Sequence, residues 1–333
     1  MSVKVGISGF GRIGRCITRS IFELERDDIE LVKINATGHI ESNIHLLKYD
    51  SIHGRFNKEV NYENGSLQIE NSKISILSER DPSDLDWTGV DIVLECTGKF
   101  NSKDKSSVHL KNGAKKVLIS APADGVDKTI VYGVNHETLQ PSDLIVSNAS
   151  CTTNCLAPVA KVIHQELKII KGFMTTIHSF TGDQPTVDRM HKDLYRARAA
   201  ALSMIPTTTG AAKAVGLVMP ELEGKLDGSA DRVPTANVSL VDLKVITDIH
   251  TSIEEVNLLF RTASESKSFK GIIGYNSEPL VSIDYNHDIN SAVLAARQTN
   301  VMEGNLVRIM SWYDNEWGFS NRMLDTAVVM GSL

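Results

Sequence analysis

Three glycines near the start of the chain constrain its fold more than any other feature. Gly9, Gly11 and Gly14 form a G-x-G-x-x-G motif between a strand-like segment, residues 3–8, and a helix-like segment, residues 12–24. In such a unit the first glycine permits the tight turn, the second lets the backbone approach a pyrophosphate, and the third allows close helix–sheet packing. The helix N-terminus adds N–H groups and a positive dipole. The motif therefore predicts a dinucleotide-binding βαβ unit.

The first half of the chain continues with short apolar runs separated by helix-like stretches. The predicted strands are residues 30–35, 91–97, 116–120, 130–132 and 144–147. Strands that alternate with helices indicate a parallel sheet covered on both faces. We therefore expect an α/β domain of the Rossmann type, with a doubly wound parallel sheet.

The second half has longer strand candidates and fewer helices. Strands are predicted at residues 172–180, 237–246, 279–285 and 306–313, and helices at 209–218 and 252–263. This order is typical of an α+β domain with a mixed or antiparallel sheet. A chain of 333 residues is also long enough for about two domains. We expect a dinucleotide-binding domain over 1–150 and a catalytic domain over 151–314, with the helix in 315–333 packing back onto the first.

Composition narrows the class of protein. Hydrophobic residues make up 41% and charged residues 23%, and the net charge is −6. This balance is that of a globular protein, and the negative charge argues against nucleic-acid and membrane partners. No apolar stretch approaches roughly 18 residues and no signal peptide is apparent. We expect a cytoplasmic protein.

The chain contains four cysteines: Cys16, Cys96, Cys151 and Cys155. Their number and spacing do not indicate a disulfide framework. The spacing is not that of metal ligands either, so no metal site is predicted. Cys151 lies at the start of a helix-like run, where N–H groups and the helix dipole favour a thiolate. Its neighbours are polar, which indicates a reactive cysteine, whereas Cys155 is interpreted as structural. His178, in the strand-like segment 172–180, is a candidate base, although a lone histidine in a strand is also often structural.

Several long runs resemble one family. They are GFGRIGR (9–15), KYDSIHGRF (48–56), ASCTTNCLAP (149–158), HKDLYRARAA (191–200), IPTTTGAAKAVG (205–216) and SWYDNEWGFSNRMLD (311–325). Together they are similar to the phosphorylating glyceraldehyde-3-phosphate dehydrogenase family, and the similarity extends along the whole chain. The resemblance implies oxidation of D-glyceraldehyde 3-phosphate to 1,3-bisphosphoglycerate with reduction of NAD or NADP, in glycolysis or gluconeogenesis.

The resemblance also implies roles for single residues. Cys151 matches the nucleophile that forms a thiohemiacetal and then a thioester, and His178 matches its base. Thr181 and Arg232 match a site for the substrate phosphate. Ser150, Thr152, Arg196, Thr209 and Gly210 match a site for inorganic phosphate. Hydroxyls, N–H groups and arginine are the groups that suit phosphate oxygens.

Cofactor-binding positions follow from the same resemblance. They are Gly9, Gly11, Arg12, Ile13, Ala36, Arg80, Thr97, Gly98, Ser120, Arg189 and Asn315. Family members are homotetramers, so the resemblance implies that assembly too. The alternative is an erythrose-4-phosphate dehydrogenase, which shares the cysteine motif. The run TTTGAAK (207–213) argues against it, because that group generally lacks this sequence.

Two places in the sequence depart from the NAD-specific pattern. An Asp or Glu normally follows the second strand and binds the ribose hydroxyls, but here Ala36 stands there, followed by Thr37 and His39. In the long loop, Arg189 and Met190 replace a Leu-Pro pair of the family. We expect use of NADP, preferred or alongside NAD. The alternative is that both positions have drifted while NAD is still used.

Overall fold

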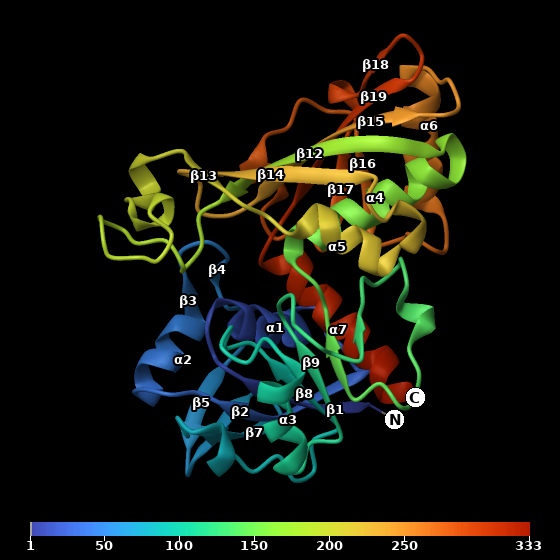
Figure 1. Ribbon diagram of the computed structural model, residues 1–333. Helices are drawn as coiled ribbons and strands as arrows, with labels where there is room; N and C mark the ends of the chain where they lie inside the picture. The colour runs from blue at the N-terminus through green and yellow to red at the C-terminus, as the bar shows by residue number, and fades with distance from the viewer. Residues whose placement is uncertain (1) are drawn as a thin grey trace. The chain divides into compact units, whose positions relative to one another are not determined.

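The computed structural model describes residues 2–333 and divides the chain into two compact units (Figure 1). Met1–Ser150 and Ser320–Leu333 form the first unit, and Cys151–Phe319 forms the second. Among the described residues, no helix is long and apolar enough to cross a membrane.

The first unit contains a nine-stranded sheet in the order β10-β11-β9-β8-β1-β2-β7-β6-β5. The strands are β1 (Val3–Ser8), β2 (Ile29–Asn35), β5 (Val60–Glu63), β6 (Ser66–Ile69), β7 (Ser72–Leu77), β8 (Ile92–Glu95), β9 (Lys116–Ile119), β10 (Lys128–Thr129) and β11 (Ile145–Ser147). All pairs from β10 to β7 are parallel, and only β6 pairs antiparallel with its neighbours. Its helices are α1 (Arg12–Glu23), α2 (Ile40–Lys48), α3 (Lys103–Lys111) and most of α7 (Trp317–Ser332).

The central strands of this sheet end at one common edge. In the β1 register Ser8 pairs with Asn35 of β2 and with Glu95 of β8. Strands β8 and β1 are almost continuously buried, as expected for parallel strands with helices on both faces. Polar side chains at the ends of buried strands therefore meet at the edge where ligands bind in such folds.

The second unit contains an eight-stranded mixed sheet in the order β13-β14-β12-β15-β19-β17-β16, with β18 beside β19. The strands are β12 (Ile169–Ser179), β13 (Ile205–Thr207), β14 (Leu226–Val233), β15 (Ser239–Thr247), β16 (Ile273–Asn276), β17 (Ala292–Ala295), β18 (Asn300–Met302) and β19 (Leu306–Tyr313). Buried and half-buried residues alternate strictly along β19, so one face of the strand packs into the core. Helices α4 (Cys151–Leu167), α5 (Ala211–Val218) and α6 (Ile253–Glu265) pack on this sheet (Figure 1).

The predicted fold class, a doubly wound parallel sheet plus an α+β part with a mixed sheet, is confirmed. Two predicted strands are wrong. Residues 130 and 131 lie outside any strand and residue 132 begins a turn, because the Asn135 side chain accepts the Val131 N–H and the Val131 carbonyl accepts the Val134 N–H. Residues 279–285 end in a short 3-10 helix, Ser282–Tyr285, because the Asp284 carboxylate accepts the Val281 N–H and closes a turn there.

Candidate active site

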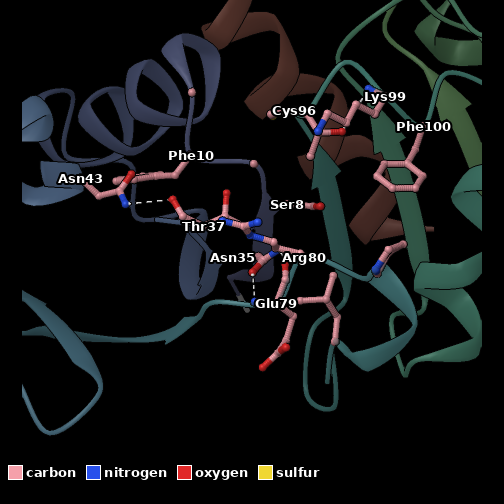
Figure 2. A pocket seen from close by; sticks show the side chains of 15 residues that line it. Ser8, Phe10, Asn35, Thr37, Asn43, Glu79, Arg80, Cys96, Lys99 and Phe100 are labelled. Carbon is pink, nitrogen blue, oxygen red and sulfur yellow. Dashed lines mark hydrogen bonds between the residues drawn. The ribbon is translucent and has the colours of Figure 1, made fainter. Parts of the chain in front are cut away.

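A cavity of about 370 Å³ lies at the carboxyl edge of the parallel sheet. It is lined by Ser8, Gly9, Phe10, Gly11, Asn35, Thr37, Asn43, Glu79, Arg80, Pro82, Leu85, Cys96, Thr97, Lys99 and Phe100 (Figure 2). These residues follow β1, β2, β7 and β8, so the cavity lies where the ends of the central strands meet.

The glycines of the motif give this cavity its shape. Gly9 has a φ of +96°, and a Cβ there would lie 2.8 Å from the Thr97 backbone nitrogen. A Cβ on Gly14 would lie 2.3 Å from the Gly9 carbonyl oxygen, whereas a Cβ on Gly11 would meet nothing within 4 Å. The space in front of Gly11 and the first turn of α1 therefore fit a dinucleotide pyrophosphate, held by N–H groups and the helix dipole.

Arg12, the first residue of α1, is engaged by a carboxylate of the same unit. Its Nη1 lies 2.6 Å from Asp50 Oδ2, and its Nη2 lies 3.2 Å from Oδ1. Burial disfavours the charged form of Asp50, but hydrogen bonds from Arg12 and from the N–H groups of Ile52 and His53 outweigh it and lower its pKa to about 2. Asp50 thus holds the Arg12 guanidinium at the start of the phosphate-binding turn.

Four of the predicted cofactor residues line the cavity: Gly9, Gly11, Arg80 and Thr97. Arg12, Ile13, Ala36, Gly98 and Ser120 belong to the same unit but do not line it, and Arg189 and Asn315 belong to the second unit. Ala36 is buried, and its neighbour Thr37 lines the wall instead.

The sequence interpretation missed several residues of the cavity wall, among them Glu79. Figure 2 shows the Asn35 side chain reaching Glu79: Asn35 Nδ2 donates to the Glu79 carbonyl, and Asn35 Oδ1 accepts the Glu79 N–H, both at 3.0 Å. The position of Asn35 at a strand end was a usable signal, because such ends gather at one edge. The segment containing Glu79 carries no such signal.

In the second unit, Cys151 is the first residue of α4 and its Sγ lies 3.5 Å from His178 Nε2. Burial raises the pKa of the Cys151 thiol, and the charge of Arg232 and the hydrogen bond from the Thr152 N–H oppose that rise. The polar neighbours of Cys151 on α4, Thr152, Thr153 and Asn154, are buried. Cys155, one turn along, is fully buried.

His178 and Arg232 face each other across parallel strands. The β12–β14 register pairs the two residues, and Arg232 Nη1 lies 3.0 Å from His178 Nδ1 and 3.0 Å from the Ser179 carbonyl oxygen. Burial and the Arg232 charge lower the pKa of His178 to about 3. Arg232 Nε is buried with no hydrogen-bond partner. Arg232 is therefore half-buried, and its Nε–H is a donor that can still bind an anion.

Tyr313 is a part of this site that the sequence interpretation missed. Its hydroxyl lies 2.9 Å from both Thr152 Oγ1 and Thr176 Oγ1, and its ring packs edge-on against His178 at 5.9 Å. The alternation of β19 points Tyr313 into the core, which is the signal that could have identified it.

Asn315 follows β19, and two serines orient its side chain. Its Oδ1 accepts hydrogen bonds from Ser179 Oγ at 2.9 Å and from Ser239 Oγ at 2.8 Å. Since the oxygen is engaged twice, the amide nitrogen is the group that Asn315 can present as a donor.

The residues expected to bind phosphate lie at several places. Thr181 follows β12, and its N–H donates to Gln184 Oε1. Thr209 and Gly210 directly precede α5, and Thr209 Oγ1 accepts the Ala211 N–H. Arg196 forms an ion pair with Asp183 at 2.7 Å, and its charge still contributes to lowering the pKa of both His178 and Arg232. The positive charges of Arg232 and Arg196 therefore both lower the pKa of His178.

Thr152 is buried on α4, and Ser150 directly precedes that helix. Ser150 and Thr152 thus flank the nucleophile in sequence, at the helix start where N–H groups favour an anion.

Comparison with known proteins identifies the family. Residues 3–103 match the family model described as glyceraldehyde 3-phosphate dehydrogenase, NAD binding domain, and residues 150–315 match the model of its C-terminal domain. The chain is 60% identical over 333 residues to the glyceraldehyde-3-phosphate dehydrogenase of Cereibacter sphaeroides, covering 100% of both chains. It is 61% identical to that of Xanthobacter flavus, covering 100% of both, and 52% identical to that of Geobacillus stearothermophilus, covering 100% of this chain and 99% of the relative. The chain belongs to the glyceraldehyde-3-phosphate dehydrogenase family.

Proposed function

We propose that the protein oxidises D-glyceraldehyde 3-phosphate to 1,3-bisphosphoglycerate, with inorganic phosphate as second substrate and NAD or NADP as oxidant. The observation that carries the proposal is the contact of 3.5 Å between Cys151 Sγ and His178 Nε2 at the start of a helix, with the half-buried Arg232 on the far side of the imidazole. A nucleophile, a base and an anion-binding cation are the groups that this reaction requires.

The chemistry proceeds on the cysteine sulfur. The sulfur attacks the aldehyde carbon, a C–S bond forms, and the carbonyl oxygen takes up a proton to give a thiohemiacetal. His178 Nε2 then accepts the hydroxyl proton while the carbon loses hydride and becomes a thioester. A phosphate oxygen attacks the thioester carbon, the C–S bond breaks, and the thiolate leaves with the acyl phosphate as product. A thiolate suits both roles because it is a soft nucleophile and a good leaving group.

NAD(P), when bound, supplies the hydride acceptor. The residues fitted to hold it are Gly9, Gly11, Arg80 and Thr97, with the first turn of α1 facing the pyrophosphate. Asn315 presents its amide nitrogen to the nicotinamide carboxamide in this proposal, since its oxygen is held by Ser179 and Ser239.

Two anion sites complete the proposal. Arg232 and Thr181 bind the phosphate of the aldehyde substrate, and the unpartnered Arg232 Nε supports this assignment. Inorganic phosphate binds Ser150, Thr152, Arg196, Thr209 and Gly210.

The dinucleotide is NADP, alone or alongside NAD. The residue after β2 is Ala36, so no carboxylate repels a 2′-phosphate there, and Thr37 gives the cavity wall a hydroxyl. Arg189 lies in an exposed part of the loop after β12 and would pair with that phosphate on a neighbouring subunit. The enzyme acts as a homotetramer in the cytoplasm, in glycolysis or gluconeogenesis.

Steady-state kinetics of the purified protein tests the proposal. Glyceraldehyde 3-phosphate and erythrose 4-phosphate are each offered with NAD and with NADP, in the presence and absence of inorganic phosphate. We expect phosphate-dependent reduction with the three-carbon substrate and a higher kcat/KM for it than for erythrose 4-phosphate. Reduction that does not depend on phosphate, or a preference for the four-carbon substrate, would contradict the proposal.

A further inference from the structure

Two serines hold the side chain of Asn315 in one orientation. Ser179, the last residue of β12, and Ser239, the first residue of β15, are both buried. Their hydroxyls donate to Asn315 Oδ1 at 2.9 Å and 2.8 Å, and Ser239 Oγ also accepts the Ser179 N–H at 3.0 Å. The three side chains therefore form a connected buried cluster, in which each serine donates its only hydroxyl proton to the same oxygen.

The reverse orientation of the Asn315 amide would leave a donor without a partner. If Nδ2 faced the serines, both hydroxyl oxygens would accept from it, and both hydroxyl protons would need another acceptor. Within residues 2–333 that acceptor is the oxygen of the other serine, 3.4 Å away, so at least one buried proton would stay unpaired. A buried donor without a partner shifts an equilibrium by about 5- to 150-fold. The cluster therefore favours the orientation in which Oδ1 faces the serines.

The backbone around Asn315 is fixed as well. Asp314 Oδ1 accepts the N–H groups of Glu316 and Trp317, at 2.9 Å and 2.7 Å, at the start of α7. Asn315 itself is buried between this capped helix start and the two serines. Its amide therefore cannot exchange oxygen for nitrogen without breaking both hydrogen bonds to the serine hydroxyls.

We propose that Ser179 and Ser239 are positioning residues that make Asn315 a donor only, so that the enzyme recognises the carbonyl oxygen on the pyridine ring of its dinucleotide and not the amino group. This inference rests on the proposed function, because it takes Asn315 as the residue that binds the nicotinamide carboxamide. A carboxamide offers an acceptor oxygen and a donor nitrogen, and a fixed donor pairs only with the oxygen. A dinucleotide with a methyl group in place of the amino group should therefore bind as well as the natural one.

Isothermal titration calorimetry with dinucleotide analogues tests the inference. The 3-acetylpyridine analogues of NAD and NADP keep the carbonyl oxygen and carry a methyl group in place of the amino group. The measured quantity is the ratio of the dissociation constant of each analogue to that of its parent dinucleotide. ADP-ribose, which has no pyridine ring, is the ligand control, and its dissociation constant should be the same in every variant.

In the unmodified protein we expect a ratio of about 1, because the amino group makes no hydrogen bond with Asn315. Asn315→Asp keeps an oxygen for the two serines and places a second oxygen where the amide nitrogen was. A carboxamide can turn its amino group towards that oxygen, whereas an acetyl group has no donor. The ratio should therefore rise to about 10 or more, the usual effect of a hydrogen bond to a charged group.

Removing both serine hydroxyls should change the ratio in the same direction. In the Ser179→Ala/Ser239→Ala variant the amide can take either orientation, so a carboxamide pairs with it in both and an acetyl group in only one. We expect the ratio to rise by about 2- to 10-fold, the range of one neutral hydrogen bond. The two single variants are measured as well, so that the test stands if the double variant does not fold.

Ser291→Ala is the matched control. Ser291 is buried in the same unit, and its hydroxyl has no hydrogen-bond partner in the part of the chain that the structure describes. Its loss removes a buried hydroxyl without touching Asn315, so the ratio should equal that of the unmodified protein.

An analogue that binds the unmodified protein more weakly than its parent by about 3-fold or more overturns the inference, because the amino group then makes a hydrogen bond of its own. So does a ratio that the serine substitutions leave unchanged. Both results come from binding alone. They are distinct from failure of the proposed function, which is a lack of phosphate-dependent NAD(P) reduction with glyceraldehyde 3-phosphate.

Discussion

The Glu95 carboxylate and the His109 ring lie 2.9 Å apart, Oε2 to Nε2, and both side chains are fully buried. Trp87 Nε1 donates to His109 Nδ1 at 3.1 Å, so the ring proton is on Nε2 and donates to Glu95. The other carboxylate oxygen accepts the Thr97 N–H at 2.7 Å. Because Thr97 lines the dinucleotide cavity, the Trp87–His109–Glu95 chain fixes one of its walls.

Glu95→Gln should weaken dinucleotide binding. A glutamine offers only one oxygen, so its amide group must face either the Thr97 N–H or the His109 N–H, and a buried donor is left without a partner. Such a loss costs about 1–3 kcal/mol, or about 5- to 150-fold in an equilibrium constant. We expect the KM for the dinucleotide to rise by this factor with a smaller change in kcat. Glu30→Gln, at an exposed position of β2, is the control, and equal effects of the two substitutions would contradict the prediction.

Cys151→Ser should abolish dehydrogenase activity, because an alcohol is too weakly acidic to act as the nucleophile and leaves poorly. His178→Asn should keep the fold and lose about 10²–10⁴-fold in kcat, the usual effect of removing a positioned base. Assays with glyceraldehyde 3-phosphate measure both. Cys155→Ala is the matched control: it removes a buried thiol outside the reacting pair, so activity should persist. Full activity of the serine variant would exclude the covalent mechanism.

The two anion sites should respond to different substitutions. Arg232→Leu should raise the KM for glyceraldehyde 3-phosphate by about 10- to 100-fold, since hydrogen bonds to charged groups contribute about 1.5–3 kcal/mol. Thr209→Ala should act mainly on the KM for inorganic phosphate. Varying one substrate at a time separates the effects, and two variants with both constants unchanged would show that the assignments are wrong.

The Arg12–Asp50 pair should make stability depend on pH at the acid end. The pKa of Asp50 is lowered to about 2 in the folded protein from 3.8, so its contribution is complete above about pH 4 and is lost as the pH falls towards 2. Asp50→Asn should therefore be less stable than the parent above pH 4, by about 1–2 kcal/mol after allowance for solvent screening. The difference should shrink as the pH falls through 2, where Asp50 is half protonated in the folded protein. Urea unfolding across this range measures it.

Asp27→Asn is the control for that experiment, since Asp27 is exposed in the same unit. Its stability should parallel that of the parent at every pH. A difference between Asp50→Asn and the parent that is constant from pH 7 to pH 2 would mean that the ion pair is not its source.

The dinucleotide preference should respond to a carboxylate after β2. Ala36→Asp should shift kcat/KM strongly towards NAD, because the new charge repels a 2′-phosphate and can bind the ribose hydroxyls. Thr37→Asp should do so at least as strongly, because Thr37 lines the cavity whereas Ala36 is buried. Arg189→Leu should weaken NADP selectively. An unmodified enzyme that uses NAD well and NADP negligibly would contradict this prediction while leaving the others intact.

Local signals in the sequence determined the framework of this protein. The glycine motif predicted the turn between β1 and α1, and the structure places Gly9 and Gly11 on the wall of a cavity. The strand predicted at residues 306–313 is β19, with the bounds that the structure shows. Such signals succeed because turn geometry and side-chain alternation are properties of consecutive residues.

The tertiary structure alone decided the surroundings of the nucleophile and the cavity wall. Arg232 lies in β14 and reaches a histidine 54 residues earlier because β12 and β14 pair in parallel. Glu95 and His109 likewise meet only because α3 packs beside the sheet. Strand pairing and helix packing depend on the free energy of the whole fold, so no local pattern encodes them.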